Sequence, residues 1–571
     1  MQGTEILPLL PELSRAGLRR LATPLRVWWR RNWIYRRFLR GTLADHIVFH
    51  PWDALPRRLE EADSLLRGRF RFHGQTVEVP DGVSVFDLPP PSQAWHLALH
   101  SFDWLPSLST AGGDNARRLA INLIGQWVKR YNAYSEPVWL PHIMARRMAH
   151  IFSHGRLVIL NSEMMWRSRL FVSLREQSKM LERIAAEAPD GLPRLEAAAV
   201  LALSGLCLDD SLKRRDAGLK RLEEEIERQI LPDGGHVSRS PEQLLSAYRH
   251  VIMVMESLSA VGEEPPHALR NAHDRVAPML RFFRHADGAL ALFNGGVEGD
   301  PRMIAGLLAR DDVRGQPFHH ARHSAYQRLV AGRTLVLLDC GKTPPGPFAL
   351  EAHAGAGAFE FSSGHHRLVV NCGAAGLTHQ AWSAALRATA AHSTLTLSDT
   401  SSGHILKPGL ARDLLGPRLL GGPREPLSRR VETAQGWTVE AMHDAYVEAF
   451  GIRHERQITV SPQGLMVTGS DRLVPVEARS AAERPAGGRN FAVRFHIHPD
   501  VRVSRLEGGG ILLKLPGGEG WRFRAGGGQL DVEESVYLGG PVVRRAEQLV
   551  ITGVMKDSPA EIAWVFEQIV A

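Results

Sequence analysis

Cysteine is scarce in this chain of 571 residues, which contains only Cys207, Cys340 and Cys372. Their spacing forms neither a paired-cysteine zinc motif nor the dense pattern of a disulfide-stapled scaffold. We therefore expect three buried small side chains in a protein that is long enough to bury large hydrophobic cores.

Long apolar runs and several familiar catalytic signatures are also missing. No run approaches the roughly 20 apolar residues that span a bilayer, and residues 1–20 lack the successive regions of a signal peptide. There is no Walker-type glycine loop, dinucleotide fingerprint, Gly-x-Ser-x-Gly elbow or His-Glu-x-x-His motif. These absences disfavour a nucleotide hydrolase and a serine or zincin hydrolase, and they predict a soluble chain without a transmembrane segment.

Acidic residues are fewer than basic ones. The chain has 61 Asp and Glu against 69 Lys and Arg, which gives a formal net charge of +8 and a pI near 9.6. A positive surface potential attracts anions and speeds their encounter with the protein. The charge therefore leaves acidic polysaccharide, nucleic acid and anionic lipid open as partners.

Residues 25–40, LRVWWRRNWIYRRFLR, interleave aromatic residues with arginines. One interpretation is a helix that lies on a membrane surface or binds an anion. The other is a helix that packs its aromatic rings onto the body of the protein while arginine stems cover apolar surface. The first interpretation predicts that deletion of residues 1–40 abolishes partner binding.

Helical periodicity is abundant between about 115 and 285. Apolar residues recur at helical spacing between Pro, Gly and Asp breaks. The pattern predicts hairpin-connected helices at 115–134, 141–157, 171–188, 192–208, 215–230, 241–261 and 266–284. The loop 231–240, LPDGGHVSRS, precedes a helix that starts at Ser240–Pro241. We expect this loop to be a tight turn that exposes His236 and Arg239.

After Asp287–Gly288 the periodicity changes from helical to alternating. Short runs such as RTLVLLDC, GAFEFSS, HRLVVNC and HSTLTLSD are separated by turns rich in Gly, Pro and His, and such runs are typical of strands. Strands at this spacing without intervening helices favour antiparallel sheets packed as a sandwich. We therefore divide the chain into a basic and linking region at 1–110, a helical domain at 111–317 and a β-sandwich domain at 318–571.

The window 322–402 contains a more specific series of motifs. Its members are Ser324–Tyr326, Leu338–Gly341, Glu351–Gly355 followed by Phe359–Glu360, Ser363–Gly364, Leu368–Asn371 and Thr389–His392. This series resembles the C-terminal domain of the heparinase II/III family of polysaccharide lyases. The resemblance implies an α+β multidomain protein in which an incomplete (α/α) toroid is followed by an antiparallel β-sandwich.

The resemblance also implies a reaction. Lyases of this family cleave a uronic-acid linkage by β-elimination, in which the carboxylate next to C5 is neutralised, a base removes the C5 proton and an acid protonates the leaving O4. The chain is then a carbon–oxygen lyase acting on an acidic, uronate-containing polysaccharide or oligosaccharide similar to a glycosaminoglycan. The alternative is a catalytically degenerate carbohydrate-binding protein of the same fold.

The sequence departs from the family's usual catalytic residues. Helix 192–208 lacks the family's Asn or His, and Gln243–Leu244 replace its Tyr-His pair. Glu351 stands where the paired motif has its first His. The remaining catalytic candidates are His236, Arg239, Tyr326 and Glu351. A cation beside Tyr326 would lower the pKa of the phenol and let it exchange protons, whereas the alternative is that Tyr326 fills the sheet core.

The family's zinc ligands carry over to His353, Asn371 and His392. Two imidazoles and a carboxylate are credible zinc ligands. Asn371 stands where the family has an Asp, however, and it offers a neutral carbonyl oxygen. We therefore expect a weakened zinc site and no other cofactor. The alternative is that His353 and His392 hydrogen-bond to each other across neighbouring strands.

Aromatic and basic side chains are the candidates for holding a sugar chain, because aromatic rings stack on sugar faces. The candidates are Trp104, Tyr248, Trp382 and Arg387. A tryptophan in such a place serves just as well as a wedge between domains, and this alternative stays open.

Family members typically work in the bacterial cell envelope, so the resemblance implies an envelope or periplasmic location. The absence of a recognisable signal peptide makes the cytoplasm the alternative. We expect no nucleic-acid partner, and the sequence does not indicate an oligomeric state.

Overall fold

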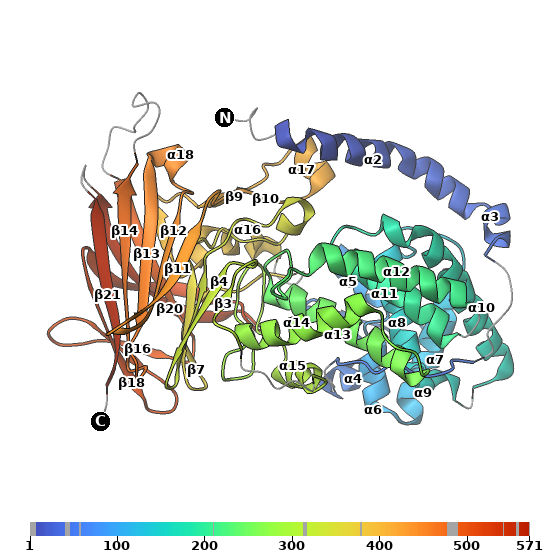
Figure 1. Cartoon of the computed structure of the whole chain (residues 1–571). Coiled ribbons are helices and arrows are strands. Elements are labelled where there is room, and N and C mark those ends of the chain that lie inside the picture. Colours follow the sequence, from blue (N-terminus) through green and yellow to red (C-terminus); the bar gives the residue numbers. More distant parts are fainter. Residues whose placement is uncertain are drawn as a thin grey trace. The chain divides into compact units, whose positions relative to one another are not determined.

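The computed structural model describes residues 7–39, 46–55, 59–160, 162–208, 211–311, 317–376, 380–476, 489–540, 542–555 and 559–569. The chain forms two compact units. The helical unit comprises Met1–Gln229 and Ser246–His273, and the sheet unit comprises Ile230–Leu245 and Asp274–Ala571 (Figure 1). The predicted order of helices followed by antiparallel strands is confirmed. The sheet unit also takes in the loop at 230–240, which places several candidate site residues in one unit.

The helices agree with the predicted ranges to within a few residues, except that the helix expected at 171–188 starts earlier. The seven predicted helices correspond to α7 (Gly113–Arg130), α8 (Pro141–His154), α10 (Met164–Ile184), α11 (Leu192–Cys207), α12 (Leu212–Gln229), α13 (Pro241–Ala260) and α14 (His267–Phe283). The sequence did not predict α4 (Leu59–Leu66), α5 (Gln93–His100), α6 (Leu105–Ala111) and α9 (Arg156–Ile159) of the helical unit, or α15 (Pro301–Leu308) of the sheet unit. A short hairpin, β1 (Arg69–Phe72) and β2 (Gln75–Glu78), completes the helical unit.

Helix α11 is the buried centre of the helical unit. Nearly all of its residues from Leu195 to Cys207 are buried, as expected for a helix that is apolar on all sides. Gly218 of α12 lets the two helices pack closely, because a Cβ atom there would lie only 2.2 Å from the backbone nitrogen of Ala202. The pair α11–α12 therefore depends on a residue without a side chain at this crossing.

The arginine-rich N-terminal segment forms α2 (Leu10–Arg31) and α3 (Trp33–Arg37), and neither helix has a buried residue. Trp28 is 62% exposed and Trp33 is 72% exposed. The interpretation that these aromatic rings pack onto the body is therefore wrong for Trp28 and Trp33. The physical reason is that Arg26 and Arg30 both pair with Glu187, which holds the polar side of α2 on the helical unit and turns its apolar side outward. Tyr35 does lie against the body, where its hydroxyl is 3.5 Å from Sδ of Met180.

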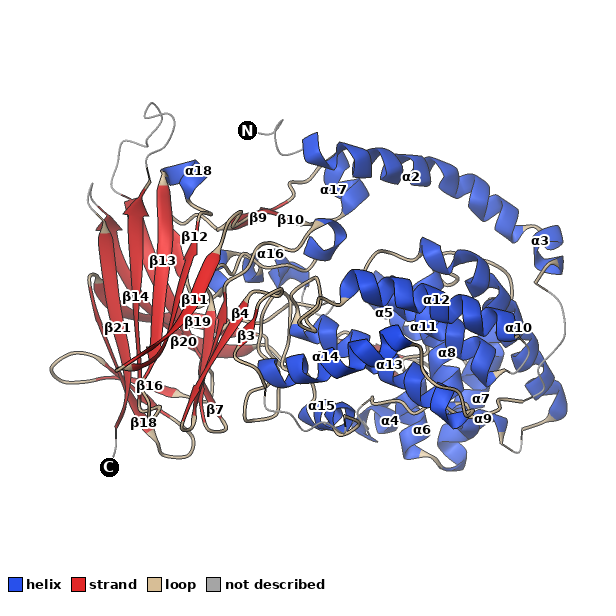
Figure 2. Cartoon of the chain, in the orientation of Figure 1, coloured by secondary structure: helices blue, strands red, loops and turns tan. Residues whose placement is uncertain are grey.

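Two large antiparallel sheets form the sheet unit, and Figure 2 shows its strands in red. One sheet has the order β11-β12-β13-β14-β21-β18-β17-β16, and the other has the order β19-β20-β15-β7-β6-β5-β4-β3, with β8 also paired to β15.

The strand bounds are β3 (His320–Ala321), β4 (Tyr326–Ala331), β5 (Thr334–Asp339), β6 (Phe359–Ser363), β7 (His366–Val370), β8 (Leu395–Leu397), β9 (Gly403–Ile405), β10 (Leu419–Gly421), β11 (Leu427–Thr433), β12 (Gly436–His443), β13 (Ile452–Val460), β14 (Met466–Pro475), β15 (Arg489–Ile497), β16 (Arg502–Arg505), β17 (Ile511–Lys514), β18 (Gly520–Gly526), β19 (Gln529–Tyr537), β20 (Arg544–Met555) and β21 (Ala560–Ile569). Short helices α16 (Ser383–Leu386), α17 (Leu410–Leu415) and α18 (Val447–Phe450) connect them.

The two sheets share one hydrophobic core. Phe359 of β6 stacks on Trp564 of β21 with ring centroids 5.5 Å apart, and Phe361 meets Trp521 of β18 edge to face. These pairs join strands of different sheets, so the alternating runs read from the sequence supply the inward faces of a sandwich. The candidate site described below lies at the β4–β5 end of this sandwich.

Candidate functional site

Tyr326 and Asp339 form the base of a polar cluster in the sheet unit. They are opposite each other in the antiparallel pairing of β4 with β5, which puts their side chains on the same face of the sheet. Arg239 reaches them from the loop that precedes α13 and forms an ion pair with Asp339. Its guanidinium also lies over the Tyr326 ring, 4.6 Å from the centroid.

The Arg239 side chain donates to backbone carbonyls as well as to Asp339. Nε donates to the Ser324 carbonyl at 2.9 Å, and Nη1 donates to the Lys342 carbonyl at 3.0 Å. Arg239 also has a positive φ of 60°, a backbone conformation that is uncommon for a residue with a side chain. The hydroxyl of Tyr326 donates to the Arg239 carbonyl at 2.7 Å and so helps to fix this conformation.

The expected exposure of His236 and Arg239 is wrong. His236 is 1% exposed and Arg239 is 9% exposed. The cause is a long-range partner, because a charged loop is buried where a carboxylate and several carbonyls satisfy it, and Asp339 provides that carboxylate. Burial also lowers the pKa of His236 to about 3, so its imidazole is neutral at physiological pH.

Tyr326 does not have the environment of a proton-exchanging phenol. Burial raises the pKa of its hydroxyl well above the usual value, and the neighbouring Arg239 only partly opposes this effect. The hydroxyl is already used as a donor to the Arg239 carbonyl and as an acceptor from Asn294 Nδ2 at 2.9 Å. The geometry therefore favours the structural alternative for this residue.

Tyr326→Phe is expected to lower the free energy of unfolding by about 1–3 kcal/mol, because it leaves a buried carbonyl without its donor. Urea unfolding of the full chain measures this change. Tyr131→Phe is the matched control, since Tyr131 is half-buried, and it should stay within about 0.5 kcal/mol of the parent. Equal stabilities of the two variants would contradict the structural role.

Little free space remains beside this cluster. A cavity of about 10 Å³ is lined by Arg239, Asn294, Asp339 and His353 together with neighbouring backbone. This volume corresponds to about one water molecule. A sugar ring therefore does not fit in the space among Arg239, Asn294 and His353.

His353 and His392 are in direct contact. Nδ1 of His353 lies 3.1 Å from Nε2 of His392, and Nδ1 of His392 lies 2.9 Å from the Ala388 carbonyl. Since Nδ1 of His392 must donate to that carbonyl, its Nε2 is the acceptor, which fits either a hydrogen bond or a metal. Burial lowers the pKa of His392 to about 4, so this imidazole is neutral.

Asn371 is less suited to complete a zinc site. Its Oδ1 accepts from the Ser393 amide at 3.1 Å, and its Nδ2 donates to Glu360 at 3.2 Å. Glu360 is itself held by His285, 3.0 Å from Nε2 of that imidazole. The residues therefore offer two good nitrogen ligands and an amide that is already engaged, and the weakened zinc site stays a prediction.

Glu351 and Glu242 are two carboxylates whose charges interact. Glu351 is exposed, whereas Glu242 at the start of α13 is partly buried. Burial, followed by the charge of Glu351, raises the pKa of Glu242 to about 7. Glu242 is the residue that sequence reasoning missed, because nothing in the local pattern of α13 distinguishes it from an exposed glutamate.

Glu242→Gln is expected to stabilise the protein at pH 8 by about 1–2 kcal/mol and to have little effect near pH 4. The folded state holds the Glu242 proton more tightly than the unfolded state, so its contribution to stability falls as the pH rises from about 4.5 to about 7. Glu242 is partly exposed, so solvent screening reduces the free energy that corresponds to its full pKa shift to this range. Denaturant unfolding at both pH values measures the effect, with exposed Glu507 changed to Gln as the control. An equal effect at both pH values would refute it.

The four candidate sugar-binding residues differ in accessibility. Trp104 and Tyr248 are buried in the helical unit, where Tyr248 stacks on His273. Arg387 is buried in the sheet unit and donates to the carbonyls of Ala349, Ala352 and Pro417. Trp382 is the exposed member of this set.

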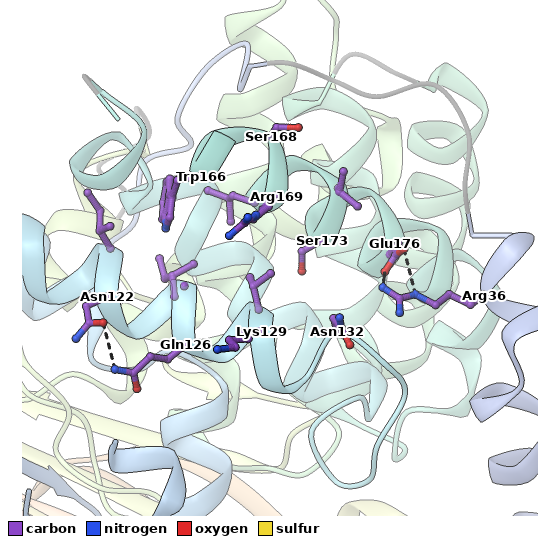
Figure 3. A pocket seen from close by; sticks show the side chains of 16 residues that line it. Arg36, Asn122, Gln126, Lys129, Asn132, Trp166, Ser168, Arg169, Ser173 and Glu176 are labelled. Atoms are coloured by element: carbon purple, nitrogen blue, oxygen red, sulfur yellow. Dashed lines mark hydrogen bonds and ion pairs between the residues drawn. The ribbon is translucent and has the colours of Figure 1, made fainter. Parts of the chain in front are cut away.

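A larger cavity lies in the helical unit between α7 and α10 (Figure 3). Its volume is about 720 Å³, and its walls include Trp166, Lys129 and Arg169 beside the side chains of Ile124 and Val172. The two cations suit an acidic ligand with an apolar part. None of the candidate catalytic, metal-binding or sugar-binding residues lines this cavity, but Arg36 of the arginine-rich N-terminal segment does.

Comparison with known proteins places the chain among relatives of two kinds. A sequence model described as "Heparinase II/III-like, C-terminal" matches residues 313–565. The "FtsZ-localized protein C" of Caulobacter vibrioides (strain NA1000 / CB15N) is 31% identical over 519 residues, covering 90% of this chain and 89% of the relative.

Solved structures of polysaccharide lyases have the same fold. Heparinase III matches with a TM-score of 0.69 at 14% identity, covering 99% of this chain and 92% of that structure. Heparan sulfate lyase HepC from Pedobacter heparinus matches with a TM-score of 0.58 at 16% identity, covering 94% and 87%. The predicted architecture of a helical toroid followed by a β-sandwich is therefore confirmed.

Proposed function

This chain belongs to the heparinase II/III-like family, and from that premise we propose that it is a non-catalytic protein of lyase fold that attaches to a membrane surface and localises with FtsZ. The outward-facing apolar side of α2 carries this proposal. The closed cluster around Arg239 supports the non-catalytic part, and the name of the Caulobacter relative supports the part concerning FtsZ.

The outer side of α2 carries an apolar stripe. Leu10, Leu18, Leu21, Leu25 and Trp28 are all exposed, and their spacing of three, four, seven and eight residues places them on one side of the helix. Leu21 is 79% exposed. Exposed apolar patches of this kind mark sites of protein or membrane interaction.

Positive charge flanks the apolar stripe. Residues 10–38 contain eight arginines and a single acidic residue, Glu12. Arg15, Arg19, Arg20 and Arg31 are exposed. Tryptophan, leucine and arginine in this arrangement are typical of a helix that lies in the interface of an anionic bilayer, where each basic residue contributes about 1 kcal/mol. Two copies of α2 would bring like charges together, which favours lipid over a second copy.

None of the described helices is both long and apolar enough to cross a membrane. A helix that lies flat in the interface does not need that length, because it buries only its apolar side. The proposal therefore concerns attachment to one surface of the bilayer.

Co-sedimentation tests this function. Purified full-length protein is incubated with polymerised FtsZ and with phosphatidylcholine vesicles that contain or lack phosphatidylglycerol. We expect the protein to sediment with the anionic vesicles and to bring FtsZ with it. Vesicle binding without FtsZ recruitment would refute the FtsZ part alone, and absence of vesicle binding would refute the membrane part.

The second candidate function is a polysaccharide lyase that cleaves a uronate-containing polymer. The interacting carboxylates Glu242 and Glu351 favour it, because a carboxyl group with a pKa of about 7 is suited to proton transfer at neutral pH. A lyase leaves a 4,5-unsaturated uronate that absorbs ultraviolet light. Incubation with a panel of acidic polysaccharides, with and without zinc, should give no such absorbance under the non-catalytic proposal. A rise that disappears in Glu351→Gln would establish the lyase.

A further inference from the structure

Two histidines and an aspartate converge in the helical unit, far in sequence from the motifs of the sheet unit. His150 and His154 are four residues apart on α8, so their imidazoles lie on one side of that helix. Asp53, from the segment before α4, approaches with Oδ2 at 3.4 Å from Nε2 of His154. The ligand atoms of all three residues lie within 4.8 Å of one another.

The cluster is shielded from water. The side chain of Asp53 is 2% exposed, and those of His150 and His154 are 4% and 17% exposed. Within the described part of the chain, this is the single group of three His, Cys, Asp or Glu that meets the same distance condition. Shielded imidazole and carboxylate groups have the composition of a metal site and lack the mobility of surface charges.

Neighbouring side chains orient the Asp53 carboxylate, and one nearby carboxylate oxygen has no hydrogen bond. Nε of Arg249 donates to Oδ1 of Asp53 at 3.1 Å, which fixes the carboxylate with Oδ2 directed at His154. This resembles the outer hydrogen bonds that orient metal ligands. Asp103 Oδ1 lies 3.3 Å from Nε2 of His150, yet it is a buried atom without a hydrogen bond. A cation beside these atoms would satisfy it.

We propose that Asp53, His150 and His154 bind a zinc ion in the helical unit. Two imidazoles and one carboxylate match zinc better than magnesium or calcium, which prefer oxygen ligands. Three protein ligands leave a fourth tetrahedral position for water. The site is distinct from the weakened zinc site predicted at His353, and it does not depend on the proposed membrane or FtsZ function.

The alternative is that this cluster binds no metal ion. Arg249, Asp53 and His154 would then form a buried ionic network in which the guanidinium alone neutralises the carboxylate. This alternative leaves the Asp103 oxygen unsatisfied. Metal binding and its dependence on His154 distinguish the two arrangements.

The test uses the full chain stripped of metal with a chelator. Zinc affinity is measured by competition with a chromophoric chelator, and the stoichiometry is measured by elemental analysis. His154→Ala is the main variant because His154 is the most exposed of the three residues, with 17% of its side chain accessible. Asp53→Asn preserves the shape of the side chain and serves as the second variant. His353→Ala, in the sheet unit, is the control, and cobalt absorbance reports the coordination geometry.

We expect His353→Ala to retain a tetrahedral cobalt spectrum and tight zinc binding. His154→Ala and Asp53→Asn should bind at least about a hundredfold more weakly, since even changes to outer hydrogen bonds cost up to that factor. Zinc binding that survives in both variants would overturn the proposal. Absence of zinc binding by the parent chain, or its loss in His353→Ala alone, would also overturn it.

Discussion

Arg239→Met is expected to lower the free energy of unfolding by about 3–5 kcal/mol, because it leaves the Asp339 carboxylate buried without its cation. Asp339 is 4% exposed. The carboxylate also accepts from the Gly341 amide at 3.0 Å and from Asn294 Nδ2 at 3.3 Å. These neutral donors do not replace a guanidinium that binds both carboxylate oxygens. Urea unfolding of the full chain, followed by circular dichroism, measures the loss.

The double variant Arg239→Met/Asp339→Asn separates a structural role from a catalytic one. If the two residues stabilise the fold chiefly as a pair, removing the second charge should restore at least half of the lost stability. If Arg239 instead exists to hold a substrate carboxylate, Arg239→Met should fold normally and lose sugar binding. Normal folding with loss of sugar binding would support a polysaccharide-binding site at Arg239, which the burial of this cluster disfavours.

Local periodicity explains why much of the fold could be predicted. The alternation in RTLVLLDC and HRLVVNC is a property of neighbouring residues, and it identifies β5 and β7 directly. The motif series also assigned His353 and His392 to one site, and the two imidazoles are in contact in the structure. The strands could be predicted from the spacing of residues within one segment. The histidine pair could be predicted because the family motif already places both residues at one site.

The burial of polar residues could not be predicted in the same way. Arg239 and Asp339 are 100 positions apart in the chain, and the loop around Arg239 has the composition of a solvent-exposed turn. Its burial depends on a partner that no local pattern reveals. The pairing of Asp53 with His154 was missed for the same reason, although the spacing of His150 and His154 was visible in the sequence.

The orientation of α2 illustrates a third kind of limit. Arginine and aromatic residues are interleaved in the sequence of this helix. This pattern does not indicate which side of the helix faces the body of the protein. The ion pairs from Arg26 and Arg30 to Glu187 decide the orientation. A residue about 160 positions away therefore determines whether the apolar stripe is buried or exposed.

Membrane attachment through α2 depends on the exposed leucines of its outer side, and the double variant Leu21→Glu/Leu25→Glu changes only that side of the helix. Burying a leucine side chain contributes about 1.5–3 kcal/mol, and two added carboxylates repel an anionic surface. We therefore expect vesicle affinity to fall at least about a hundredfold. Both residues are exposed, so the fold should be unaffected.

The most direct measurement is co-sedimentation of the full chain with phosphatidylglycerol vesicles, comparing Leu21→Glu/Leu25→Glu with Leu212→Glu/Leu427→Glu. The control pair also lies at exposed leucines and adds the same charge elsewhere. We expect the α2 variant to stay in the supernatant and the control to sediment like the parent. Sedimentation of the α2 variant with the vesicles, or equal loss in both variants, would contradict attachment through this helix.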